Sequence, residues 1–228
     1  MDITKLNKKP MYLSLLAAVW AINAAIGVSN DTFAADPPTQ RAEAIDEWVS
    51  LVDDKHVPFW KFIDFGGREA FEIDNGVLTV EAGYPMAGFV YTDAFPKNNY
   101  ELELEAKKIQ GTDFFCLVTF PVGDQFCSLV VGGWGGTVTG ISCIDGVDAS
   151  ENQTKSARKY EKDRWYKVRI QVQPNRIRCW LDDETIVDLP TEGVELSLRT
   201  DVDNTKPLSV CSFETISQWK NIRFKSLK

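Results

Sequence analysis

The sequence predicts an all-β fold, a single-domain sandwich of antiparallel strands. Three observations support this prediction: short strand-like segments recur along the chain, turn residues separate them, and no helical segments alternate with them in a βαβ rhythm. With 228 residues, of which 44% are hydrophobic, the chain can bury one sizeable core. All-β sandwiches of about 200–250 residues commonly form one domain. Antiparallel strands joined by short turns pack as two layers.

The first residues have the pattern of a secretory signal peptide over 1–34. Lysines come first, the apolar run MYLSLLAAVWAINAAIGV follows, and Ala34 and Ala35 offer small residues at a cleavage point. The alternative is a membrane anchor, because about 18 apolar residues lie near the lower limit for a spanning helix. We expect cleavage, a linker over 35–45 and a folded domain over 46–228. The protein would then be secreted or periplasmic, with no membrane contact after cleavage.

Alternation of apolar and polar residues identifies the strands. In YELELEAK, Tyr100, Leu102 and Leu104 alternate with glutamates, the period-two pattern of a strand with one buried face. Similar segments lie over 76–82, 113–120, 125–131, 165–173, 175–181, 184–189, 208–213 and 219–224. Turn-forming stretches such as DNG, FPKNN, PVGD and LDDE separate them. The only helix that we expect is a short one within QRAEAIDEWVSL, residues 40–51.

The cysteines and the single histidine give no sign of a metal site. The cysteines are Cys116, Cys127, Cys143, Cys179 and Cys211. No C-x-x-C spacing occurs and His56 is the only histidine, so spacing indicates neither a zinc site nor a Cys-His nucleophile. A disulfide between Cys116 and Cys127 is an alternative, if residues 121–124 form the turn of a hairpin. The apolar surroundings of each cysteine favour instead a small buried side chain.

An acidic balance restricts the partners of this chain. The sequence has 25 Lys and Arg against 33 Asp and Glu, a formal net charge of −8. Affinity for nucleic acid comes chiefly from clustered Lys and Arg, so this charge argues against nucleic acid as the main partner. We expect a monomer.

The segment VVGGWGGTVTG, residues 130–140, places Trp134 between two pairs of glycines. Glycine weakens a strand and exposes backbone, so these residues leave room beside the ring. The polar residues that follow are Asp145, Asp148, Glu151 and Asn152. A sugar stacks on an aromatic ring while carboxylates and amides take its hydroxyl groups. This part of the chain therefore suits a carbohydrate ligand.

Each of these features has a second interpretation. Trp134 could cap an edge of the sandwich, with glycines that serve tight turns. The segment DGVDASENQT, residues 145–154, could be an ordinary loop or a calcium-binding one, because closely spaced side-chain oxygens suit a hard cation. Arg158 could be a surface charge or a ligand contact. We expect no cofactor and assign no metal ligand, while calcium binding by this segment remains an alternative.

Several segments resemble a known family. EWVSLVDDKHVPFW, FEIDNGVLTVEAG, NNYELELEAK, RWYKVRIQVQPNRIRCWLDDETIVD and WKNIRF follow, in order, the landmarks of the 3-keto-disaccharide hydrolase domain. The central segment 111–154 is similar to an exported, planctomycete-type branch of that family. The resemblance covers nearly all of residues 46–227. It implies a concanavalin-like jelly roll, the fold of lectins and glucanases, and activity on 3-keto-glycosides.

The chain departs from the family pattern at two places. Many members have NSG followed by an arginine on the strand that here covers 112–120, and a glutamine and a histidine before a closing FRNI. Here Asp113 stands near the asparagine position, no arginine follows, and SVCSFETISQ contains no histidine. Because a fold does not determine function, the resemblance predicts the fold more firmly than it predicts catalysis.

Two functions from different classes follow. In the first, the protein is a secreted hydrolase: a ketone at C3 acidifies the C2 proton, a carboxylate base removes it, and the aglycone leaves before water adds. The candidate catalytic residues are Glu105, Asp113, Asp145 and Glu151, and the candidate substrate-binding residues are Trp134, Asp148, Asn152 and Arg158. Glu105 is preferred in the groove because it matches an acidic position of the family. In the second, the protein is a lectin-like carbohydrate-binding module without turnover, which the missing histidine and arginine favour.

Overall fold

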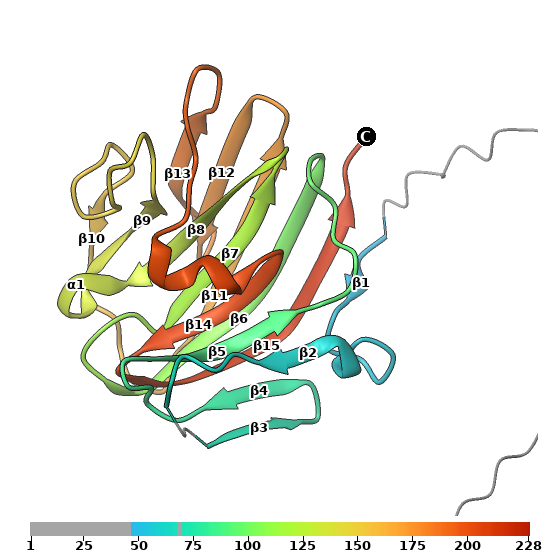
Figure 1. Ribbon diagram of the computed structural model, residues 1–228, viewed down its shortest axis with the longest axis vertical. Helices are drawn as coiled ribbons and strands as arrows, with labels where there is room; N and C mark the ends of the chain where they lie inside the picture. The colour runs from blue at the N-terminus through green and yellow to red at the C-terminus, as the bar shows by residue number, and fades with distance from the viewer. Residues whose placement is uncertain (1–46, 68–69) are drawn as a thin grey trace, which may run out of the picture. The chain divides into compact units, whose positions relative to one another are not determined.

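Two antiparallel sheets pack face to face in the computed structural model, which describes residues 47–67 and 70–228 (Figure 1). Sheet A runs in the order β13 (Glu184–Pro190), β12 (Arg176–Leu181), β11 (Trp165–Gln173), β6 (Tyr100–Gly111), β15 (Thr215–Ser226), β4 (Val77–Val80) and β3 (Phe71–Asp74), and β1 (Val49–Ser50) also pairs with β15. Sheet B runs in the order β10 (Ser156–Ala157), β9 (Val138–Ser142), β8 (Gln125–Gly132), β7 (Cys116–Val122), β14 (Leu208–Phe213), β5 (Met86–Tyr91) and β2 (Trp60–Phe62). The predicted all-β antiparallel sandwich is confirmed.

The predicted strand segments all overlap observed strands, whereas the predicted helix does not form where it can be checked. Val49 and Ser50 lie in β1, where they pair with Phe224 and Arg223 of β15. Sheet pairing therefore overrides the local helical pattern at this end of residues 40–51. The rest of that helix, the signal peptide and the linker lie outside the described residues. Short helical turns that the sequence did not predict are η1 (Val57–Phe59), α1 (Gly133–Gly136) and η2 (Thr200–Thr205).

The main core lies between the two sheets. On β6, Tyr100, Leu102 and Leu104 are fully buried, as their alternation with glutamates predicts. Trp219 of β15 and Phe89 of β5 are also fully buried in this core. Burying a large apolar side chain contributes about 1.5–3 kcal/mol. The inner faces of both sheets thus supply the stability on which the surface features depend.

The five cysteines are buried and free. Cys116 and Cys127 lie on the two strands of a hairpin, but Cys116 faces Val131 across the strands and Cys127 faces Phe120. The hairpin is therefore as predicted, while its register separates the two cysteines that a disulfide would join. Burial raises the pKa of the Cys116 thiol. These side chains behave as small buried hydrophobic groups.

A second apolar cluster lies on the outer face of sheet B, beneath η2, which crosses that sheet in Figure 1. Val202 of η2 packs in this cluster with Leu117 and Val130 of the sheet. Thr205, at the end of η2, has its Oγ1 atom 2.7 Å from Oγ1 of Thr119 on β7. Apolar contact and a hydroxyl pair thus hold η2 over the sheet. None of the helices in the described part of the chain has the length and apolar character that a membrane crossing requires.

Candidate functional site

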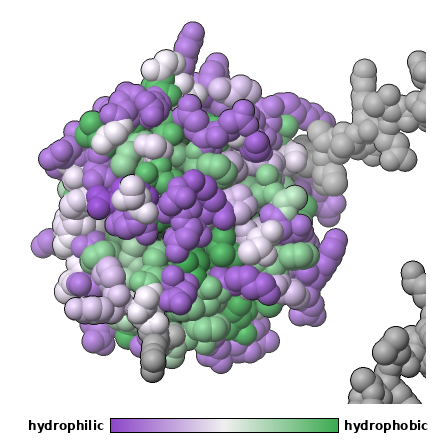
Figure 2. All heavy atoms as spheres, in the orientation of Figure 1, coloured by the Kyte–Doolittle hydropathy of each residue, from purple (hydrophilic) through white to green (hydrophobic). Residues whose placement is uncertain are grey.

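A cavity of about 220 Å³ opens on the outer face of sheet B, beside η2. Its walls are mostly apolar and come from β5, β7, β8, α1, β9, β14 and η2, together with the loop before β7 and Arg199 just before η2. The polar residues that line it are Asp113, Ser128, Ser142, Arg199 and Asp201. Figure 2 views this side of the molecule and shows hydrophobic surface between hydrophilic patches. A mostly apolar hollow with a few convergent polar groups is the usual form of a small-ligand site.

Trp134 lies at the cavity in a left-handed turn. Gly132, Trp134 and Gly135 have φ values of 79°, 48° and 81°. Glycine adopts this conformation without strain, whereas a bulky side chain rarely does. The side chain of Trp134 is 40% exposed, so its ring lines the cavity and still meets solvent. The flanking glycines therefore form the turn that presents this ring.

Asp113 holds the Trp134 turn in place. Its Oδ2 atom accepts a hydrogen bond from the Gly135 N–H at 2.9 Å, and its Oδ1 atom accepts one from the Phe114 N–H at 2.8 Å. Thr215 Oγ1 donates to the Asp113 carbonyl at 3.1 Å. Asp113 thus connects the loop before β7, the turn after β8 and the start of β15. A carboxylate and an exposed indole are brought to one cavity, although they are far apart in sequence.

Arg199 forms the charged wall of the cavity. Its Nη1 atom donates to Asp148 Oδ2 at 2.6 Å, and its Nε atom donates to Asp201 Oδ1 at 3.2 Å. Ser142 Oγ donates to the other Asp148 oxygen at 2.7 Å. Burial alone would raise the pKa of Asp148, but the hydrogen bonds from Ser142 and Cys143 and the Arg199 charge outweigh it and lower that pKa. Asp148 is therefore ionised at neutral pH and fixes the guanidinium.

The structure brings three of the predicted site residues together. Asp113 and Trp134 line the cavity. Asp148 does not line it but accepts hydrogen bonds from Arg199 and Ser142, which do. Asp145 is exposed and exchanges hydrogen bonds with the backbone of Glu195 instead.

The other predicted site residues lie elsewhere. Asn152 is buried, and its amide contacts only neighbouring chain segments. Arg158 makes two hydrogen bonds of 3.0 Å to Glu184. Glu151 is exposed and does not line the cavity. Glu105 lies on the outer face of sheet A, where Asn221 Nδ2 donates to it at 2.6 Å. None of these side chains faces the cavity, and their predicted roles stay predictions.

Four polar residues of the cavity were missed by the sequence reasoning: Ser128, Ser142, Arg199 and Asp201. The two serines occupy strand positions that alternation assigns to a face but not to a ligand. Arg199 and Asp201 belong to LRTDVDNTK, a polar stretch with the composition of a turn. The alternation of charged residues in this stretch is the only sequence signal that could have pointed to a binding role. Only the crossing of η2 over sheet B brings that stretch to the cavity.

The residues that could hold a metal are few. Within the ranges 47–67 and 70–228, no group of three or more His, Cys, Asp and Glu side chains is arranged around a common point that could hold a metal ion. In the segment proposed above as a possible calcium loop, Asp148 is occupied by Arg199, and Asp145 Oδ1 accepts the Glu195 N–H at 2.9 Å. A cation at Asp148 would have to compete with the guanidinium.

Solved structures with this architecture include carbohydrate-binding and enzymatic proteins. The metal-free carbohydrate recognition domain of Emp46p is 8% identical, with 79% of this chain and 95% of that one covered at a TM-score of 0.51. A protein of unknown function with a galectin-like fold from Bacillus subtilis is 9% identical, with 81% and 96% covered at 0.52. The apo Crh5 transglycosylase is 8% identical, with 79% and 83% covered at 0.51. At such identities these likenesses show the fold alone, a concanavalin-like jelly roll.

The family is shown by the sequence itself. Residues 47–225 match the family model of the 3-keto-alpha-glucoside-1,2-lyase-like domain. The chain belongs to this family, in agreement with the resemblance described above. The comparison with curated proteins gives no match.

Proposed function

We propose that this protein binds a 3-keto-glycoside in the sheet B cavity and cleaves it. The observation that carries the proposal is the meeting of an exposed indole, a carboxylate and a guanidinium at one hollow, namely Trp134, Asp113 and Arg199. Membership of the 3-keto-alpha-glucoside-1,2-lyase-like family supports the substrate class. The signal-peptide pattern of residues 1–34 supports action outside the cytoplasm. The protein works as a monomer in this proposal.

The reaction needs a base and a group that stabilises an enolate. Asp113 takes the proton from C2 of the sugar, and the electron pair moves toward the C3 ketone. The enolate electrons then form the C1–C2 double bond while the bond from C1 to the glycosidic oxygen breaks, and the aglycone leaves with that oxygen, which takes up the proton that Asp113 removed. Water then adds across the resulting double bond. Asp113 is the proposed base because Asp201, the other carboxylate at the cavity, is ion-paired with Arg199.

Arg199 is the proposed group that stabilises the enolate. Two of its nitrogens are held by Asp148 and Asp201, and among the described residues its Nη2 atom has no hydrogen-bond partner. That N–H group is available for a ligand oxygen on which negative charge develops. Preorganised donors of this kind commonly contribute the largest single part of transition-state stabilisation. Asp148 and Ser142 act through Arg199 as positioning residues.

Release of aglycone from a 3-keto-glycoside tests the proposal directly. The wild-type protein should release it, and Asp113→Asn should lower the rate by about 10²–10⁴-fold, because the amide cannot act as the base. The amide also keeps only one of the two acceptors that hold the Trp134 turn, so thermal unfolding and sugar binding of the variant are measured beside the rate. The same amide substitutions at Glu105, Asp145 and Glu151 decide on the remaining predicted carboxylates, and we expect no comparable loss there. Full rate loss at any of those three, with Asp113→Asn active, would remove Asp113 from the reaction.

A non-catalytic carbohydrate-binding module is the second candidate. The observation that favours it is the engagement of both Asp113 oxygens by backbone N–H groups, because these contacts give the carboxylate a structural role in holding the Trp134 turn. The only histidine, His56, has its Nδ1 atom 2.6 Å from Asp53 and does not line the cavity. Sugar binding by the wild type without release from oxidised or ordinary glycosides, with and without added Ca²⁺, would establish this module and end the hydrolase proposal.

Replacing Trp134 with alanine should weaken sugar binding by about 1–2 kcal/mol, because the ring supplies an apolar stacking surface. The melting temperature should stay nearly unchanged, since the side chain is 40% exposed. Titration calorimetry and thermal unfolding of the variant measure the two effects, and Trp134→Phe, which keeps an aromatic ring, is the control. A large loss of stability with unchanged binding would make Trp134 a structural cap of the sandwich.

A further inference from the structure

The outer face of sheet A, on the side of the sandwich opposite the cavity, carries more positive than negative side chains. Its cations are Lys107, Lys167, Arg169, Arg176, Arg178, Lys220, Arg223 and Lys225, from the neighbouring strands β12, β11, β6 and β15. Their carboxylate partners are Glu101, Glu103, Glu105 and Asp188. We call this set of eight cations the cationic face. Four carboxylates leave half of its charge without compensation.

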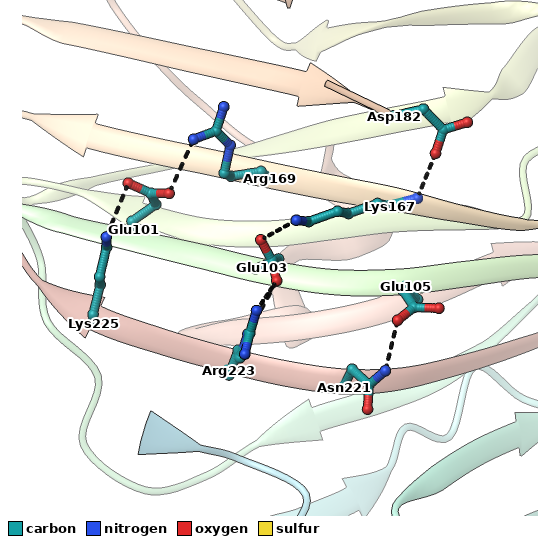
Figure 3. Close-up of polar contacts among 9 residues, drawn as sticks. All are labelled: Glu101, Glu103, Glu105, Lys167, Arg169, Asp182, Asn221, Arg223 and Lys225. Carbon is teal, nitrogen blue, oxygen red and sulfur yellow. Dashed lines mark hydrogen bonds and ion pairs between the residues drawn. The ribbon is translucent and has the colours of Figure 1, made fainter. Parts of the chain in front are cut away.

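The ion pairs show how the surplus arises. Glu103 is shared by Lys167 at 2.9 Å and Arg223 at 2.5 Å. Figure 3 shows cations from β11 and β15 approaching the glutamates of β6 from both sides. Glu101 is shared in the same way, and Asp188 of β13 is shared by two arginines of β12. Because each of these three carboxylates serves two cations, each of them leaves one positive charge in surplus.

Tryptophan rings lie beneath several of these cations. Lys107 and Lys220 both lie over the ring of Trp165, with Nζ atoms 4.6 and 4.2 Å from its centroid. Arg169 covers Trp180 in the same way at 3.9 Å. Contact of a cation with an aromatic face is attractive even at exposed sites. The rings thus hold the charges in a fixed array that still meets solvent.

This local charge contrasts with the chain as a whole. The net charge of the protein is −8, so a positive face is not a by-product of a basic composition. Sheet A has further carboxylates in Glu184 of β13, which pairs with Arg158, and in Glu72 and Asp74 of the edge strand β3, beyond β4. At the end of β11 Arg164 pairs with Asp182 and adds no net charge. Within a Debye length of about 8–10 Å of the cationic face, an anionic ligand therefore meets mainly positive groups.

We propose that the cationic face is a second binding surface, which takes an acidic polysaccharide that carries carboxylate or sulfate groups. Neighbouring strands lie about 4.8 Å apart, so the cations form a flat grid on which an extended anionic chain can lie. Lys and Arg pair with such groups through charge-assisted hydrogen bonds. Nucleic acid fits less well, because cations cover the faces of Trp165 and Trp180 on which bases would stack. The proposal concerns the opposite sheet and does not depend on catalysis in the cavity.

Binding to dextran sulfate, with uncharged dextran as its matched control, tests this surface. The test variant combines Lys107→Gln, Lys167→Gln, Arg178→Gln and Lys225→Gln. Four cations and four carboxylates then remain on this face, so its surplus positive charge is removed. Glu101, Glu103 and Asp188 each keep one partner, Arg169, Arg223 and Arg176, and Glu105 keeps Lys220, so the fold should persist. We expect wild-type binding that weakens as salt rises, and at least about a tenfold loss in the variant at low salt.

A charge-matched control separates this face from the overall charge of the protein. It replaces Lys55, Lys61, Lys155 and Lys159, exposed lysines outside the cationic face, with glutamine. This variant should bind dextran sulfate about as well as the wild type. Equal loss in both variants, equal binding of dextran, or tighter binding of single-stranded DNA of matched charge would overturn the proposal. Thermal unfolding and sugar binding in the cavity should be unchanged in both variants. A failure of the polysaccharide proposal is therefore distinguishable from a failure of the proposed function of the cavity.

Discussion

Replacing Arg199 with glutamine should lower kcat/KM for aglycone release from a 3-keto-glycoside by about 10²–10³-fold. The guanidinium is held at the cavity by Asp148 at 2.6 Å and Asp201 at 3.2 Å. Its charge is therefore in position before the enolate forms and requires no reorganisation at the moment of reaction. Most of the loss should appear in kcat, since the negative charge exists only on the way to and in the intermediate.

Two further variants define the role of Arg199. Arg199→Lys keeps a charge but lacks the planar fork that contacts two carboxylates, so it should recover only part of the activity. Arg164→Gln, at an exposed arginine paired with Asp182 away from the cavity, is the matched control and should keep wild-type rates. Steady-state kinetics and a thermal unfolding curve are needed for each variant. Equal activity of Arg199→Gln and the control would remove Arg199 from the reaction.

Replacing Asn152 with alanine should lower the free energy of unfolding by about 2–4 kcal/mol, because four hydrogen bonds of a buried amide are lost together. Its Nδ2 atom donates to the carbonyls of Ile141 at 2.7 Å and Val147 at 3.0 Å. Its Oδ1 atom accepts from the Thr154 N–H at 2.9 Å and from Thr154 Oγ1 at 2.6 Å. Urea unfolding measures the loss, which arises from buried backbone groups left without partners.

The neighbouring amide provides the control for this prediction. Gln153 is exposed, so Gln153→Ala should change the free energy of unfolding by less than about 0.5 kcal/mol. Sugar affinity should be the same in both folded variants, because Asn152 does not line the cavity. If Asn152→Ala unfolds like the control but loses sugar affinity, Asn152 contacts the ligand and the role predicted from the sequence is correct.

The fold was predictable because strand periodicity is a local property. In β6, alternation places Leu102 and Leu104 on one face and the glutamates on the other, and the structure buries the leucines completely. The prediction failed at Val49 and Ser50, where pairing with distant β15 decides the conformation. Short strands and turns such as β10 and α1 carry too few residues for a period to be visible.

The candidate site was predictable only in part, because its residues come from distant segments. Glycines around Trp134 indicate an exposed ring and Asp113 is a candidate carboxylate, but nothing local to either residue shows that Gly135 and Asp113 share a hydrogen bond. Arg199 was missed for the same reason. Its position depends on η2 lying over sheet B, and the apolar cluster that holds η2 there includes Val202 and Leu117, which are far apart in the chain.

By itself, the sequence determined the class of fold, the family and the residues that share each strand face, since these depend on composition, order and a period of two. It determined that Glu101, Glu103 and Glu105 lie on one face of one strand. Only the tertiary structure decided that this face is the outside of sheet A rather than the wall of the cavity. The reason is physical: strand order and the packing of two sheets assign each face its neighbours, and those contacts join residues that no local pattern connects.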